Sequence, residues 1–126
     1  MQDVKELRVW QIGIELCRAV YRATSAFPRA ELYGLTSQMR RAAIAIPSNL
    51  AEGRARGSRK DYRQFVIIAR GSACELETQV IIARELSFLS ASDAEEVLAV
   101  VAEVIRMLNG LARALGEAPD ESAAAP

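Results

Sequence analysis

The chain has 126 residues, of which 51% are hydrophobic and 25% are charged, a composition typical of a single globular domain. Sixteen basic residues balance sixteen acidic ones, and histidine is absent from the sequence. The lack of histidine excludes the Glu-x-x-His ligand sets of di-iron bundles, histidine phosphotransfer and histidine-based catalytic triads. No secretory signal and no apolar stretch of about 18 residues are present, so we expect a cytoplasmic protein without a membrane segment.

The first predicted helix runs from about Glu6 to Ser25. One row of residues at helical steps predicts its core face: Trp10, Gly13, Ile14, Cys17, Val20, Tyr21 and Thr24. A second set of apolar residues lies off this row: Val9, Ile12 and Leu16. Two apolar faces indicate either deep burial within a bundle or burial against another subunit.

The second predicted helix follows a short connector at Phe27-Pro28 and carries the most distinctive stretch of the chain. Its apolar residues recur at three- and four-residue steps: Leu35, Met39, Ala42, Ala43, Ile46, Leu50 and Gly53. Pro47 lies within this pattern, where its ring excludes the carbonyl of Ala43 and removes a hydrogen-bond donor. The pattern continues in phase past the proline, so we predict one helix kinked between Ala43 and Pro47. The alternative is two helices broken at Ile46.

The third predicted helix spans Arg59 to Leu89, after a turn in which Ser58 caps the helix together with Asp61. Two apolar columns are found on it. The first contains Tyr62, Val66, Ala69, Ala73, Leu76, Val80 and Ala83, and the second contains Ile67, Cys74, Ile81 and Phe88. One column fits a bundle core, and the other is most simply covered by a second copy of the chain.

The fourth predicted helix opens with a capping box at Ser92-Asp93-Ala94-Glu95 and is closed by Gly116. Its core face is the most regular in the chain: Val97, Leu98, Val101, Val104, Ile105, Leu108, Leu111, Ala112 and Leu115. We therefore predict an all-α fold, an up-down-up-down four-helix bundle formed by residues 1–116, with a disordered acidic and alanine-rich tail at residues 117–126.

Candidate reactive groups are few. Three glutamates could be imagined as a carboxylate site, Glu52, Glu75 and Glu77, but acids on long helices are usually solvated or paired with bases. The segment from Gly53 to Gly57 lacks the lysine and the preceding strand of a phosphate-binding loop. The two cysteines, Cys17 and Cys74, lie on apolar columns and are expected to be buried free thiols. We predict no enzyme, no catalytic residues, no metal and no cofactor.

The polar residues around the proline, Pro47, Ser48, Asn49 and Glu52, could form a functional motif. The structural interpretation, which we favour, is a kink at which Ser48 or Asn49 supplies a side-chain hydrogen bond to the backbone. Glu52 would then pair with an arginine of a neighbouring helix.

Charge is unevenly distributed along the chain. Residues 36–63 carry seven bases against two acids: Arg40, Arg41, Arg54, Arg56, Arg59, Lys60 and Arg63. Residues 93–126 carry seven acids against two bases. These regions are either solvated or paired with one another, or the basic one forms a nucleic-acid surface.

Four segments carry a family resemblance: LRVWQIGIELCRAVY, YGLTSQMRRAAIAIPSNLAEG, GSRKDYRQFVIIARGSACELETQ and RMLNGL. They resemble the four-helix-bundle proteins encoded in intervening sequences of large-subunit ribosomal RNA, over residues 3–115. That family is similar to the accessory variability determinants of diversity-generating retroelements. The resemblance implies a barrel-like homopentamer and, for the retroelement relatives, a basic surface that binds RNA or DNA and a reverse transcriptase partner.

Two classes of function remain open from the sequence. One is a nucleic-acid-associated accessory protein that binds phosphates through the seven basic residues of segment 36–63. The other is a structural or protein-interaction module. The surplus of apolar faces on the first and third helices predicts self-association in both cases.

Overall fold

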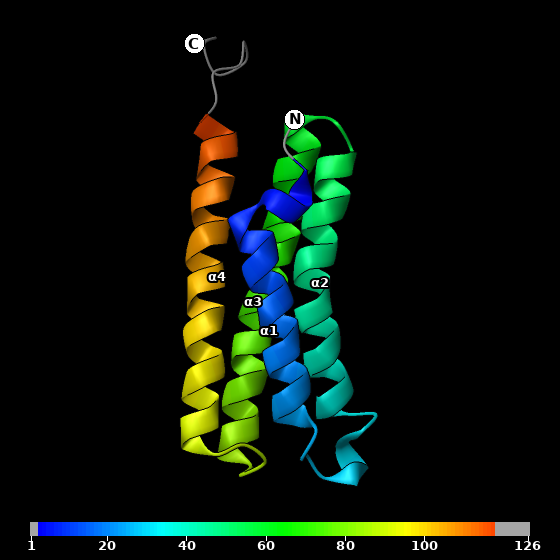
Figure 1. The fold of residues 1–126 in the computed structure, drawn as a ribbon, viewed down its shortest axis with the longest axis vertical. Coiled ribbons are helices and arrows are strands. Elements are labelled where there is room, and N and C mark those ends of the chain that lie inside the picture. The colour runs from blue at the N-terminus through cyan, green and yellow to red at the C-terminus, as the bar shows by residue number, and fades with distance from the viewer. Residues whose placement is uncertain (1–2, 118–126) are drawn as a thin grey trace.

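The computed structural model describes residues 3–117, and all of its regular structure is helical. Four long helices, α1 (Arg8–Thr24), α2 (Leu35–Ala55), α3 (Arg59–Glu85) and α4 (Ala91–Glu117), alternate in direction and form one bundle (Figure 1). Short 3-10 turns, Val4–Glu6 and Arg29–Glu31, precede α1 and α2. The predicted up-down-up-down bundle is confirmed. The disordered tail was predicted from Glu117 onwards, but Glu117 is the last residue of α4; the rest of the predicted tail, from Ala118, lies outside the described residues.

The core face of α1 differs from the predicted one. Leu16 is fully buried, and Val9 and Ile12 are each 3% exposed, although all three were placed off the core row. Tyr21, which was placed on that row, is 43% exposed. The true core face lies between the two apolar rows, so the second row is buried by the bundle itself rather than by another subunit.

The second helix stays continuous through Pro47, which is itself buried. The predicted single helix is confirmed and the alternative, two helices broken at Ile46, is excluded, while a kink between Ala43 and Pro47 remains a prediction. A Cβ atom added to Gly13 of α1 would lie 3.5 Å from Cδ of Pro47, so the proline ring packs directly against the glycine backbone. Near its end α2 packs closely on α3, since a Cβ atom at Gly53 would lie 2.7 Å from Cβ of Phe65.

The third helix ends at Glu85, four residues before the predicted end. Ser87 adopts φ 62°, in the left-handed region that stops a helix. The amide of Phe88 then donates to the carbonyl of Ala83 at 2.9 Å, and the amide of Ser87 donates to Arg84 at 3.0 Å. This is the hydrogen-bond pattern of a Schellman motif, with serine in the position that glycine usually occupies.

Serine caps begin both α3 and α4. The predicted cap of α3 is confirmed, because the amide of Asp61 donates to Oγ of Ser58 at 3.1 Å. The predicted capping box of α4 is wrong by two residues: Ser90, not Ser92, accepts from the amide of Asp93 at 3.0 Å. Ser90 follows the turn directly, so the helix begins as soon as the chain reverses.

The first apolar column of α3 forms its core face as predicted, whereas the second is only partly covered. Cys74 in this second column is exposed, so its predicted burial is wrong. Cys17 is half-buried and free, and its burial raises the pKa of the thiol above the ordinary value.

Among the described residues no helix is apolar over a length that would cross a membrane.

Candidate nucleic-acid interface

The structure gathers five of the seven predicted basic residues at one end of the bundle and leaves two elsewhere. The five surround the turn between α2 and α3, and we call them the basic corner: Arg54, Arg56, Arg59, Lys60 and Arg63. The same end of the bundle holds the last turn of α4 (Figure 1). The basic corner therefore lies beside a segment that is far from it in the chain.

Arg40 and Arg41 do not belong to the basic corner. Fourteen residues of α2 separate Arg40 from Arg54, which is about 21 Å along the helix axis at 1.5 Å per residue. Nε of Arg40 donates to Oγ1 of Thr24 at 2.9 Å, and its guanidinium lies 4.4 Å from the ring centre of Tyr21. Arg41 lies in the groove between α2 and α3. The seven residues predicted as one surface are therefore divided among three places.

Two arginines of the basic corner close the end of α4. Nε of Arg59 donates to the carbonyl of Leu115 at 3.3 Å, and Nε of Arg63 donates to the carbonyl of Ala112 at 3.1 Å. The carbonyl of Leu115 is among the last four of α4, which have no partner within the helix, whereas the carbonyl of Ala112 lies one turn earlier, and the helix dipole places negative charge at this end. Both arginines therefore have a structural role. Because a carbonyl carries no net charge, these contacts do not compensate the positive charge of either arginine as an ion pair would.

Arg56 is engaged locally. It forms an ion pair of 2.9 Å with Glu52, one turn earlier, in which both side chains are about half exposed, at 52% and 53%. Glu52 was predicted to pair with an arginine of a neighbouring helix, so its partner was wrongly assigned. Exposed pairs of this kind contribute about 0.3–0.5 kcal/mol, which leaves Arg56 available to a stronger anion.

Arg54 is the least exposed base of the basic corner. Its guanidinium lies 5.4 Å from the ring centre of Tyr62, a residue that is 7% exposed and was expected in the core. Nη2 of Arg54 and the hydroxyl of Tyr62 are both buried without a hydrogen-bond partner among the described residues. Buried polar groups in proteins are nearly always paired, so these two donors are unusual.

Among the polar residues around Pro47, Glu52 joins the basic corner through its ion pair with Arg56, and Asn49 makes a contact within α2. Nδ2 of Asn49 donates to the carbonyl of Ala45 at 2.7 Å, so the predicted side-chain hydrogen bond to the backbone is present, but its acceptor is not Ala43, the carbonyl that Pro47 leaves without a donor. Ser48 is exposed. These contacts are local to α2 and create no site.

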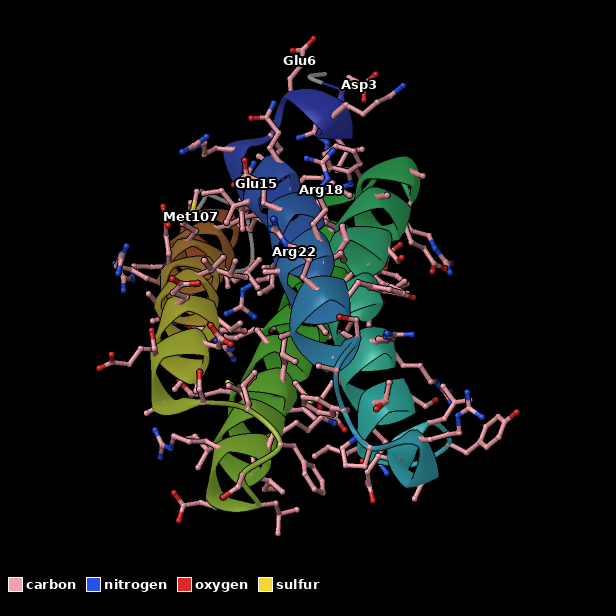
Figure 2. The ribbon with its side chains drawn as sticks, turned by 60° about the horizontal axis from the view of Figure 1, so that its bottom comes forward. Asp3, Glu6, Glu15, Arg18, Arg22 and Met107 are labelled. Carbon is pink, nitrogen blue, oxygen red and sulfur yellow. The ribbon has the colours of Figure 1, made fainter. Side chains whose placement is uncertain are left out.

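Other charged groups are spread over the bundle. Glu15, Arg18 and Arg22 lie along the outer face of α1, away from the basic corner (Figure 2). Within residues 3–117 no three His, Cys, Asp or Glu side chains are grouped so that they could hold a metal ion.

Sequence reasoning missed two contributors to the basic corner. The end of α4 was assigned to an acidic region, yet its carbonyls bind Arg59 and Arg63. Tyr62 was regarded only as a core residue, and its unpaired hydroxyl has no signal in the sequence. Both depend on packing between segments about 50 residues apart.

Comparisons with known proteins agree with the fold. A family model described as 23S rRNA-intervening sequence protein matches residues 5–110. A solved structure of a protein of unknown function from the S23 ribosomal protein family of Bacteroides thetaiotaomicron is similar, with a TM-score of 0.74 and 18% sequence identity. The match covers 82% of this chain and 97% of that one. No curated protein matches the chain.

Proposed function

The chain belongs to the 23S rRNA-intervening sequence protein family, and we propose that it is a non-enzymatic, self-associating bundle that binds RNA through the basic corner. The observation that carries this proposal is the set of exposed bases around one turn. Lys60 has no ion-pair partner among residues 3–117, and the partner of Arg56 is a half-exposed surface acid. Arg59 and Arg63 add positive charge beside them.

The basic corner suits phosphates better than bases of the nucleic acid. Its aromatic residues are unavailable for stacking, because Tyr62 is buried and the ring of Phe65 lies under the guanidinium of Arg56 at 5.1 Å. Affinity should therefore come from contacts to the phosphate backbone. It should fall steeply as salt rises and depend little on RNA sequence.

Self-association would repeat the basic corner several times on one particle and so strengthen a weak contact. Three isoleucines on the outer side of α2 and α3 support a contact with a second copy. Ile44 of α2 and Ile68 and Ile82 of α3 are 42%, 45% and 42% exposed. A chain without net charge also has no general repulsion between copies. Following the resemblance, five copies is the number we propose.

Light scattering on a sizing column tests the assembly. We expect a mass that is a multiple of 13.8 kDa, and a smaller one for Ile68→Glu, which places a charge on the proposed contact face. Tyr33→Glu is the control, because Tyr33 is 93% exposed but lies in the connector before α2. A wild-type protein that runs as a monomer at micromolar concentration would contradict self-association.

Binding of fluorescently labelled single-stranded RNA, followed by anisotropy, tests the function. Arg56→Glu combined with Lys60→Glu should abolish binding at about 50 mM salt, where phosphate contacts are strongest. These two positions are chosen because Arg59 and Arg63 also hold the end of α4, so their replacement would disturb the fold. The matched control is Arg18→Glu combined with Arg22→Glu, an equal change of charge on the outer face of α1 (Figure 2).

Three results of this experiment lead to different conclusions. Equal loss in both double variants would mean that only total charge matters. Absence of RNA binding by the wild-type protein would favour the alternative function, a protein-interaction module that uses the exposed isoleucines of α2 and α3. Equal affinity for single-stranded DNA would broaden the proposal from RNA to nucleic acids in general.

A further inference from the structure

The acidic residues near the C-terminus fall into groups that lie at different distances from the basic corner. Asp93, Glu95 and Glu96 belong to the first turns of α4, at least about 28 Å along the helix axis from Leu115 at 1.5 Å per residue. They form no ion pair with the basic corner. Three further acids belong to residues 117–126, which we call the acidic segment: Glu117, Asp120 and Glu121.

The acidic segment begins beside the basic corner. A Cβ atom added to Gly116 would lie 2.9 Å from Nε of Arg63, so the last turn of α4 contacts this group of bases. Asp120 and Glu121 follow Glu117 by three and four residues. Because a chain spans at most about 3.6 Å per residue, both lie within about 14 Å of the end of α4. The exposed bases of the turn between α2 and α3 are therefore within reach of both carboxylates.

The charges of the acidic segment and the basic corner are complementary. The five bases of the basic corner outnumber the two acids beside them, Glu52 and Asp61, by three, and the acidic segment carries three acids and no base. The last turn of α4 contains no base of its own. The helix dipole places negative charge at that end and disfavours further anions there. Bases from another helix are therefore needed to stabilise these acids, and the basic corner supplies them.

Attachment to α4 strengthens what would otherwise be a weak contact. A single exposed ion pair contributes little by itself. A group tethered by only a few residues, however, is held at an effective concentration in the millimolar range. Arg56 is engaged only by the half-exposed Glu52, and Lys60 has no ion-pair partner among residues 3–117. These two bases are available to the carboxylates of the acidic segment.

We propose that the acidic segment occupies the basic corner in the absence of RNA, with the carboxylates of Asp120 and Glu121 paired with the exposed bases of the turn. The pairing itself requires no RNA. Its consequence, competition between these carboxylates and RNA phosphates, rests on the proposed function. RNA would then displace carboxylates as well as counterions from the bases, so that both its affinity and the salt dependence of its binding are lower than the five bases alone would give.

Amide chemical shifts of the ¹⁵N-labelled full chain test the pairing without RNA. Asp120→Asn combined with Glu121→Gln removes both carboxylates and keeps the size of the side chains. At about 50 mM salt we expect this variant to shift the amides of residues 57–60 and to leave those of residues 87–90, at the opposite turn, unchanged. At about 500 mM salt the difference should disappear, because screening weakens interactions between exposed charges.

The RNA anisotropy measurement tests the competition. The same variant should bind single-stranded RNA about three- to tenfold more tightly than wild type at about 50 mM salt, the effect of two exposed ion pairs. Its affinity should also fall more steeply as salt rises. Glu95→Gln combined with Glu96→Gln is the matched control, an equal change of charge at two exposed positions near the other end of α4. This control should alter RNA affinity by less than about twofold, because it lies well beyond the Debye length.

The pairing is overturned if the carboxylate variant leaves the amides of residues 57–60 unchanged at low salt. The competition is overturned if both double variants tighten RNA binding equally, or if RNA affinity stays the same although the amides shift. Absence of RNA binding by the wild-type protein and by the carboxylate variant counts against the proposed function. The amide shifts then decide the pairing by themselves, so the two proposals fail separately.

Discussion

The turn between α2 and α3 and the turn between α3 and α4 are built by the same local rules. Each contains one residue with positive φ, Gly57 at 85° in the first and Ser87 at 62° in the second. Each leads into a helix capped by serine, and in both the serine hydroxyl accepts from an aspartate amide three residues later. In their backbone conformation and helix capping, the two turns are therefore alike.

Their surroundings differ. The turn between α3 and α4 is sealed by Phe27, which is 8% exposed and packs on Phe88 with 5.8 Å between ring centres. Residues 55–61 of the other turn are all exposed. Packing from a distant segment thus ties Phe88 and Leu89 of one turn to the core, although Leu86, Ser87 and Ser90 beside them are exposed, whereas every residue from 55 to 61 is exposed at the other turn.

The largest effect is expected where the sealed turn is opened. Phe27→Ala should destabilise the protein by about 3–4 kcal/mol, because it removes a buried aromatic ring and leaves a cavity. Arg56→Ala at the exposed turn should change stability by less than about 0.5 kcal/mol. Urea unfolding followed by circular dichroism measures both. Similar losses in the two variants would show that the turns do not differ in burial.

A smaller effect is expected where the exposed turn joins the core. Gly53→Ala should cost about 1–3 kcal/mol, because the added Cβ atom would lie 2.7 Å from Cβ of Phe65. Gly71→Ala is the control. No atom lies within 4 Å of its Cβ position, so alanine should stabilise the helix by about 0.5–1 kcal/mol. Chemical denaturation of both variants gives the comparison, and effects of the same sign would refute it.

The two serine caps should contribute equally if the turns share one design. Ser58→Ala and Ser90→Ala should each lower the free energy of unfolding by about 1 kcal/mol, since each leaves one amide of the helix start without its acceptor. The same denaturation experiment applies. A loss confined to Ser90→Ala would mean that solvent replaces the cap at the exposed turn.

The smallest effect should come from exchanging the residues with positive φ. Ser87→Gly should stabilise by about 0.5–1 kcal/mol, because glycine adopts the left-handed conformation without steric cost. The reciprocal change, Gly57→Ser, should destabilise by a similar amount. Differential scanning calorimetry would resolve both as shifts of the melting temperature. Stabilisation by Gly57→Ser would show that the exposed turn changes its backbone conformation.

Much of the fold could be predicted because its determinants are local. The start of α3 at Arg59, the continuity of α2 through Pro47 and the regular core face of α4 all follow from residue spacing and capping. The end of α3 was misplaced because Ser87 adopts a conformation that glycine usually signals. The cap of α4 was misplaced because Ser90 and Ser92 are both plausible from sequence, and only the position of the preceding turn selects one.

Which residues form each helix follows from the sequence alone. The reason is that helical hydrogen bonds, capping and apolar periodicity all act within a single segment of the chain. Packing of the helices against one another sets which face of α1 is buried and leaves Cys74 exposed. It also brings Arg59 and Arg63 to the end of α4 and leaves the hydroxyl of Tyr62 unpaired. These features depend on the rotation of each helix about its axis and on the approach of distant segments. Periodicity restricts that rotation to a broad apolar arc, and only packing of the four helices together selects one angle within it.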